Sequence, residues 1–391
     1  MKKTLEFGAN YKEFTIGDIA ILGNNQPLIL NNSQSINTFP IAYQTYGKLN
    51  DDASNAILLC HALTGDQYAA STNPITNKDG WWQFMIGNDL AIDTNKFFVI
   101  CSNIIGGCMG SFGPKEINPI NNKPFGSQFP AITIADMVNA QNMLIASLGI
   151  KKLYAVIGGS TGGMQALTWA SLYPQKVTKI IALATSYRHS PQNIAFHEVG
   201  RQAIINDSEY CGGKYLEYRK FPKNGLALAR MAAHITYLSQ DALQRKFGRN
   251  LQNDKIGNNG NYKTASLDSQ YIPEFAVENY LHYQAINFID RFDANSYIYI
   301  TKAVDYFDLE SDNNNNLSLA FVKSNMVEFC LISFSDDWLF PPSESEKLTA
   351  SLLINGAKVS NITINSHNGH DSFLIKNQQM ESIISGFLNN N

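Results

Sequence analysis

Residues 153–174 read LYAVIGGSTGGMQALTWASLYP: an apolar run, a glycine-rich turn and a helical pattern in direct succession. The apolar run is typical of a strand buried on both faces. At the junction, the pattern G-x-S-x-G places Ser160 on a tight strand-to-helix turn, where a helix N-terminus offers free N–H groups to a developing negative charge. The stretch predicts an α/β protein with a nucleophilic serine; the alternative is a glycine-rich turn without chemistry.

The same strand signal recurs along the chain. From residue 55 on, the runs are continuously apolar, which favours a mostly parallel sheet, whereas the earlier ones alternate better and favour an antiparallel entry to it. Helical patterns at 134–149 and 162–174 separate the strands, so we expect a doubly wound α/β sheet. The predicted strands are 14–22, 39–47, 55–60, 97–102, 153–158, 179–185, 327–334 and 359–365.

This alternation stops after residue 186 and the strand pattern resumes only at 327. In between, helical patterns run over 225–247 and 272–292, with a polar loop at 251–268. We therefore predict a core built from residues 1–186 and 305–391, interrupted by a helical lid at 187–304. The asparagine run 313–316 indicates a solvated linker.

Composition limits the function classes. The 391 residues include 30 Lys+Arg and 33 Asp+Glu, a net charge of −3, so no basic excess favours nucleic acid. No apolar stretch approaches the ~18–20 residues that cross a bilayer. Glu6 and Lys12 interrupt any signal-peptide core, and the five cysteines form no CxxC pair. We expect a cytoplasmic protein that binds neither membranes nor nucleic acid.

A nucleophilic serine needs a base that is itself oriented by an acid. In α/β-hydrolases these follow the serine in the order Asp/Glu, then His, after the last strands. The strand at 327–334 is followed by Asp336 and Asp337, and the strand at 359–365 by His367 and His370. Residue patterns alone leave both choices open. The remaining histidines of the insertion are interpreted as solvated or core residues; they are His189, His197, His234 and His282.

An oxyanion hole requires two backbone donors. We expect them to be the N–H groups of Thr161, which follows the nucleophile, and of Leu63, in the loop after the strand at 55–60. His61 is interpreted as a buttress of that loop. Cys108 lies in GGCMG (106–110), which imitates the serine motif, but SFGP follows it and would break a helix. We interpret this segment as a glycine-rich loop.

Long motifs are similar to the homoserine O-acetyltransferase family of the α/β-hydrolase fold, over about residues 40–375. They include NAILLCHALTGD, GGSTGGMQALTWA, GLALARMAAHITYLS, RFDANSYIYITKAVDYFDL, SDDWLFPP and GHDSF. The resemblance implies Ser160 as nucleophile, Asp337 as acid and His370 as base. Thr161 departs from the Met that this family commonly carries there, and the polar insert at 308–318 is longer than usual.

The resemblance further implies a substrate-binding pair, Arg230 and Asp371, which suits the carboxylate and ammonium of L-homoserine. It implies acetyl-CoA as co-substrate, no cofactor, no metal, and a homodimer formed through the lid. Similar enzymes that use succinyl-CoA carry Arg where this chain has Leu339, so Leu339 indicates an acetyl donor. The alternatives are a serine O-acyltransferase or homoserine O-succinyltransferase of the same fold, an esterase, or a non-catalytic binding protein.

Overall fold

A computed structural model describes residues 3–7, 12–251 and 275–390. Its centre is an eight-stranded sheet in the order β16-β15-β14-β13-β7-β10-β6-β3. The pairs from β16 to β10 are parallel, whereas β6 pairs antiparallel with both β10 and β3. The strands are β3 (Asp18–Leu22), β6 (Phe39–Tyr46), β7 (Ala56–Cys60), β10 (Phe98–Ser102), β13 (Leu153–Gly159), β14 (Val177–Leu183), β15 (Glu328–Phe334) and β16 (Lys358–Ile364).

The predicted strands lie within two residues of the observed ones, with one correction. The run 14–22 is not a single strand, because it divides at Gly17 into β2 (Lys12–Ile16) and β3. Only β3 joins the central sheet, while β2 pairs with β1 (Lys3–Phe7) in a separate hairpin. An alternating run that contains a glycine therefore did not guarantee a single strand.

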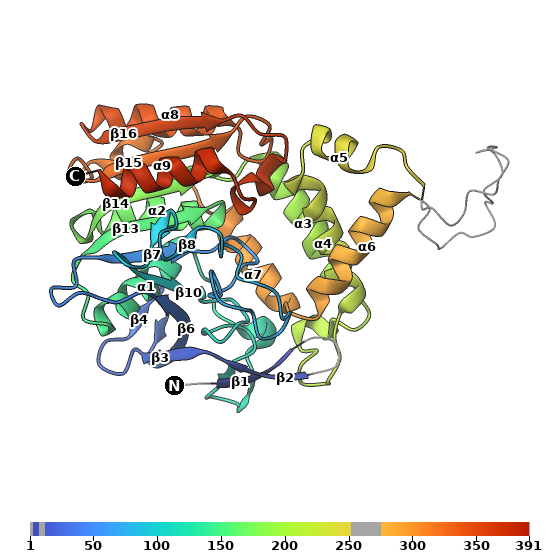
Figure 1. Cartoon of the computed structure of the whole chain (residues 1–391). Helices are drawn as coiled ribbons and strands as arrows, with labels where there is room; N and C mark the ends of the chain where they lie inside the picture. Colours follow the sequence, from blue (N-terminus) through green and yellow to red (C-terminus); the bar gives the residue numbers. More distant parts are fainter. Residues whose placement is uncertain (1–2, 8–11, 252–274, 391) are drawn as a thin grey trace.

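Helices cover both faces of the sheet (Figure 1). Alternate strand residues belong to two different cores: Leu58 and Val156 pack with α1, α2 and α8, whereas Ile57 and Ile157 pack with α9. This explains why the strands read as continuously apolar, since neither face meets water. The covering helices are α1 (Ile134–Ser147), α2 (Thr161–Leu172), α8 (Pro342–Ile354) and α9 (Gln378–Asn389).

A layer of helices interrupts the core between β14 and β15 and stands to one side of it in Figure 1. The predicted helical run 225–247 is two helices: the first ends at Tyr237, and Ser239 caps the start of the second, its Oγ accepting from the N–H of Ala242 at 3.0 Å. The predicted loop 251–268 falls almost wholly outside the described residues. The helices are α3 (Pro191–Ile205), α4 (Lys223–Tyr237), α5 (Gln240–Phe247), α6 (Ala276–Ile289) and α7 (Ala294–Asp305).

The two connections between core and helical layer run side by side. Arg188 and Asp308 form an isolated antiparallel bridge, and the N–H of Leu309 donates to the carbonyl of Tyr187 at 3.0 Å. The asparagine run follows, where Asn314 and Asn315 have positive φ in an exposed turn, in line with a solvated segment. The layer therefore begins and ends at one point of the core.

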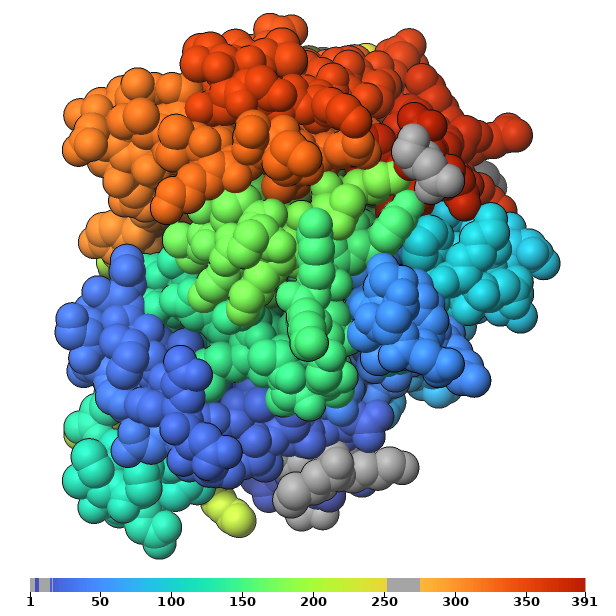
Figure 2. All heavy atoms as spheres, turned by 90° about the vertical axis from the view of Figure 1, so that its left-hand side faces the viewer, coloured from blue at the N-terminus to red at the C-terminus, as the bar shows by residue number. Residues whose placement is uncertain are grey.

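Figure 2 shows the face of the core opposite to these helices, where blue, green and orange to red segments all reach the surface. There the C-terminal segment, red, lies beside cyan residues from the region after β7. Lys96 Nζ donates to Asn389 Oδ1 at 3.1 Å, and the hydroxyl of Tyr154 bonds the carbonyl of Leu388. These contacts fix α9 on the sheet.

Short elements complete the fold. Within the described ranges, none of the helices has the length and apolar character that crossing a membrane requires. The short strands are β4 (Leu28–Ile29), β5 (Ser35–Ile36), β8 (Ile86–Gly87), β9 (Ile92–Asp93), β11 (Ile117–Asn118) and β12 (Lys123–Pro124). The 3₁₀ segments are η1 (Gly126–Gln128), η2 (Pro174–Lys176), η3 (Cys211–Gly213), η4 (Ser311–Asn313), η5 (Leu317–Phe321) and η6 (Gly369–Leu374).

Candidate active site

Ser160 stands on the turn between β13 and α2, with a φ of 57° that side chains rarely adopt. Glycines make the turn possible: a Cβ on Gly158 would lie 2.1 Å from the carbonyl oxygen of Gly162, and one on Gly162 would lie 2.0 Å from that of Cys60. The N–H of Ser160 donates to the carbonyl of Leu183 at 2.9 Å, which ties the turn to β14. The turn and this backbone hydrogen bond thus fix the position of the serine side chain.

Two further side chains line up behind this hydroxyl. His370, in η6, places Nε2 2.8 Å from Ser160 Oγ and Nδ1 2.8 Å from Asp337 Oδ2. The structure separates the two pairs that residue patterns alone left open. His367 is exposed, and Asp336 instead accepts the N–H of Gly369 at 3.0 Å. Ser160, His370 and Asp337 therefore form one hydrogen-bonded line, with each member less than 10% exposed.

The surroundings of Asp337 and His370 set their roles. Asp337 Oδ1 accepts from the N–H groups of Leu339 at 2.9 Å and Phe340 at 3.0 Å, so the carboxylate is held with Oδ2 toward the imidazole. Burial lowers the pKa of His370, but the charge of Asp337, its hydrogen bond and the charge of Asp371 outweigh it and raise that pKa above 6.5. This arrangement favours proton transfer to His370 from the serine.

The two predicted oxyanion residues lie beside the serine. Thr161 opens α2, whose first N–H groups have no partner within the helix. Leu63 follows β7 in a loop supported by His61, whose Nε2 accepts from the N–H of Ile104 at 3.3 Å. Burial lowers the pKa of His61 to about 4, so a neutral ring buttresses the loop as expected. Leu63 and Thr161 line the same cavity as Ser160.

This cavity has a volume of about 130 Å³ and also contains Arg230, Asp371 and Leu339 in its wall. Arg230, from α4, lies over the ring of Phe288, with 4.6 Å between Cζ and the ring centre. Burial raises the pKa of Asp371, against the opposing charges of His370 and Arg230. The structure thus brings the assigned catalytic, oxyanion, substrate-binding and donor-specificity residues to one place, although they come from five separate segments of the chain.

The chain was compared with protein families and with known proteins. The chain matches the family model for the alpha/beta hydrolase fold over residues 55–376. Homoserine O-acetyltransferase from Mesorhizobium japonicum is 53% identical over 366 residues, which cover 94% of this chain and 91% of that protein. This chain belongs to the homoserine O-acetyltransferase family. It is an enzyme of the acyltransferase class.

Two solved structures share this fold, but their names assign them different reactions. Homoserine O-acetyltransferase from Bacillus anthracis has a TM-score of 0.84 at 29% identity and covers 96% of this chain and 97% of its own. The esterase E22 has a TM-score of 0.82 at 28% identity and covers 95% and 99%. The family fold therefore carries both transferases and esterases, so the acceptor must be argued from the site.

Cys108 is not among the residues that line the cavity of Ser160. It sits in the glycine-rich loop 106–110, outside any helix, with Sγ 3.8 Å from the carbonyl oxygen of Arg291. Burial raises the pKa of its thiol to about 12, which keeps the sulfur protonated.

Sequence reasoning missed several members of the cavity wall. His189, His197 and His234 line it together with Tyr237, whereas His282 is exposed as expected. Their positions depend on how α3 and α4 pack over the core, and nothing in the local pattern of the insertion marks them. The long GLALARMAAHITYLS motif was the available signal, because Arg230, His234 and Tyr237 share its helix at helical spacing.

Proposed function

We propose that this enzyme transfers the acetyl group of acetyl-CoA to the hydroxyl of L-homoserine, giving O-acetyl-L-homoserine for methionine biosynthesis. The observation that carries the proposal is the line from Asp337 through His370 to Ser160, in a chain about half identical to curated homoserine O-acetyltransferases. Its chemistry uses side chains and backbone N–H groups, so we propose no metal and no cofactor beyond the co-substrate.

The reaction divides into two half-reactions. In the first, His370 takes the proton of Ser160 Oγ as the oxygen attacks the thioester carbon, and the carbonyl oxygen becomes an oxyanion facing the N–H groups of Leu63 and Thr161. The C–S bond then breaks, His370 returns the proton to the sulfur, and CoA leaves an acetyl ester on Ser160. The second half repeats these steps with the hydroxyl of homoserine as nucleophile and Ser160 as leaving group.

The acceptor is recognised by charge. Homoserine carries a carboxylate and an ammonium, and the cavity offers the guanidinium of Arg230 and the carboxylate of Asp371. No ion pair joins these two side chains among the described residues, although the charge of Arg230 lowers the pKa of Asp371 against the effect of burial. A zwitterion placed between them would pair a charge with each.

The helical layer supports transfer over hydrolysis. His197, Arg230 and Tyr237 enter the cavity from α3 and α4, so the layer forms part of the wall around the nucleophile. A covered site limits the access of water to the acetyl ester. A neighbouring cavity of about 240 Å³ shares Thr64 and Arg230 with the first, and we propose it as an approach to the site.

We also propose that the enzyme is a cytoplasmic homodimer joined through this layer. Large apolar side chains are more than half exposed on three of its helices: Val199 on α3, Leu228 on α4, and Tyr283 and Ile286 on α6. Exposed apolar surface of this kind is often covered by a partner subunit. Sedimentation of the purified protein, with Ile286→Asp as the variant, tests the dimer.

The experiment that tests the activity is product identification by mass spectrometry after incubation with acetyl-CoA and homoserine, or acetyl-CoA and serine. We expect O-acetyl-L-homoserine as the main product. The likeness to esterase E22 makes hydrolysis the second candidate, so free acetate is measured in the same samples. Acetate without acetylated amino acid would identify an esterase, and O-acetylserine as main product would identify a serine acyltransferase.

A further inference from the structure

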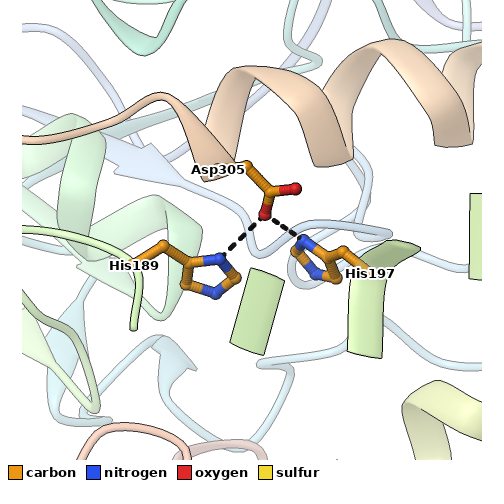
Figure 3. A group of neighbouring side chains, drawn as sticks. All are labelled: His189, His197 and Asp305. Atoms are coloured by element: carbon orange, nitrogen blue, oxygen red, sulfur yellow. Dashed lines mark hydrogen bonds and ion pairs between the residues drawn. The ribbon is translucent and has the colours of Figure 1, made fainter. Parts of the chain in front are cut away.

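A second group of imidazoles and a carboxylate adjoins the nucleophile's cavity (Figure 3). His189 precedes α3, His197 lies within it, and Asp305 ends α7. Both imidazoles place Nδ1 on the same carboxylate oxygen, Asp305 Oδ1, at 3.0 Å for His189 and 2.7 Å for His197. These two hydrogen bonds join α3 and the segment before it to the end of α7, beside the active site; we call this arrangement of His189, His197 and Asp305 the hydrogen-bonded lock.

The carboxylate of Asp305 is also ion-paired with Arg201, which in turn pairs with Glu198. Its other oxygen, Oδ2, accepts from Arg201 Nη1 at 2.6 Å, and the Arg201 side chain is only 2% exposed. Residues of this type can bind a metal ion, and the three ligand atoms lie within 4.8 Å of one another. A cation here would have to displace both imidazole hydrogens and share the carboxylate with a buried guanidinium. The arrangement therefore favours a hydrogen-bonded lock over a metal site.

The lock determines which nitrogen of each ring carries hydrogen. An ionised carboxylate only accepts, so both Nδ1 atoms must donate, and in a neutral imidazole this leaves Nε2 with a free lone pair. Burial lowers the pKa of His189 to about 4, so this ring is neutral near pH 7. Figure 3 shows the second ring nitrogen of each histidine turned away from Asp305.

Both histidines are part of the wall of the reaction cavity. His189 and His197 line it with Ser160 and Leu339, and within the described ranges no hydrogen bond is formed by either Nε2. Nε2 of His234 is fully buried and has no hydrogen-bond partner, whereas Nε2 of His189 and of His197 is not in that situation. In its neutral form, each of the two rings therefore offers one hydrogen-bond acceptor that the triad chemistry does not use.

We propose that His189 and His197 bind the acyl donor, accepting through Nε2 the amide N–H groups of the pantetheine arm of acetyl-CoA. This inference rests on the proposed function. Asp305 is already held by both rings and by Arg201, which also pairs with Glu198, so the ring nitrogens are the acceptors left for an N–H donor. The acetyl methyl offers no hydrogen. Two methylene groups separate the thioester sulfur from the first amide, which keeps that amide near Ser160 during attack.

Two donors that deliver the same acetyl group separate binding from general damage. Acetyl-CoA contains the amides, whereas p-nitrophenyl acetate contains none, and both acetylate Ser160 in the proposed mechanism. For His189→Leu and His197→Leu, we expect kcat/KM of acylation to fall about tenfold with acetyl-CoA and to stay unchanged with the ester. Gln at either position keeps an acceptor near the place of Nε2 and should restore most of the acetyl-CoA rate.

His282→Leu, on the exposed face of α6, is the matched control and should change neither rate. Equal losses with both donors would show that the histidines support only the structure, and no loss with either would show that they do not touch the donor. A stoichiometric metal in the purified enzyme, with activity lost on chelation, would overturn the hydrogen-bonded lock. Wild-type enzyme that acetyl-CoA fails to acylate would refute the proposed function itself, a result distinct from the others.

Discussion

Arg230 Nη1 donates a hydrogen bond of 3.1 Å to Oγ1 of Thr64, in the loop that also carries Leu63. The same guanidinium packs on Phe288, and its Nε is buried without a partner among the described residues. A buried charged donor left unpaired costs free energy, which the carboxylate of homoserine would offset in the proposed function. The contact also joins Arg230 to the loop that carries Leu63.

Arg230→Ala should therefore act on the second half-reaction. We expect kcat/KM for homoserine to fall about ten- to a hundredfold, because a charge-assisted contact to the substrate carboxylate is lost. Acetylation of Ser160 by acetyl-CoA alone should change little, as rapid-quench mass measurement can establish. Equal losses in both half-reactions would mean that Arg230 mainly supports the Thr64 loop.

Ser160→Ala should abolish the acyl-enzyme and nearly all turnover while the fold persists, because the neighbouring glycines and backbone bonds keep the turn. Intact-mass measurement after mixing with acetyl-CoA should find one added acetyl group on wild type and none on the variant. Cys108→Ala serves as the control and should retain the adduct. An acetyl group mapped to Cys108 would contradict the assignment of the nucleophile.

Asp337→Asn should reduce kcat by about 10⁴, because the amide cannot hold the imidazole in the required tautomer or stabilise its charge. Asp336→Asn should be much milder, since its contact is the N–H of Gly369, which an amide oxygen also accepts. Steady-state rates and melting curves of both variants separate chemistry from stability. The reverse ranking would mean that the acid is the other aspartate.

The pH profile should follow His370. The base must be neutral to accept the serine proton, and Asp337 helps to raise its pKa above the ordinary 6.5. Activity should thus be lost as pH falls, with a midpoint for kcat/KM above 6.5. Asp337→Asn removes the raising charge, so its residual activity should show a lower midpoint. A wild-type midpoint below 6.5 would indicate that another group limits the reaction.

Donor choice should depend on Leu339, which lines the cavity while its N–H stays bound to Asp337. Succinyl ends in a carboxylate, whose burial needs a cation, and the side chain of Leu339 supplies none. Wild type should prefer acetyl-CoA over succinyl-CoA, and Leu339→Arg should shift the ratio of kcat/KM toward succinyl-CoA. Leu339→Met controls for side-chain size. A wild type that favours succinyl-CoA would refute this reading of Leu339.

The sequence by itself determined the sheet and the serine turn, because both depend on local rules. Strands buried on two faces must be apolar throughout, as residues 153–158 are, and a bend at Ser160 with φ of 57° leaves no room for side chains at Gly158 and Gly162. The break of the run 14–22 at Gly17 escaped the same rules, since pairing partners and not composition decide where a strand turns away.

Only the tertiary structure decided which side chains from distant segments contact one another. Asp336 and Asp337 share one loop, and their roles separate because one side chain faces His370 and the other faces the N–H of Gly369. The lock of His189 on Asp305 joins residues 116 positions apart. Such contacts arise from the packing of α3 and α7 over the core, which depends on long-range geometry that periodicity and motif spacing do not contain.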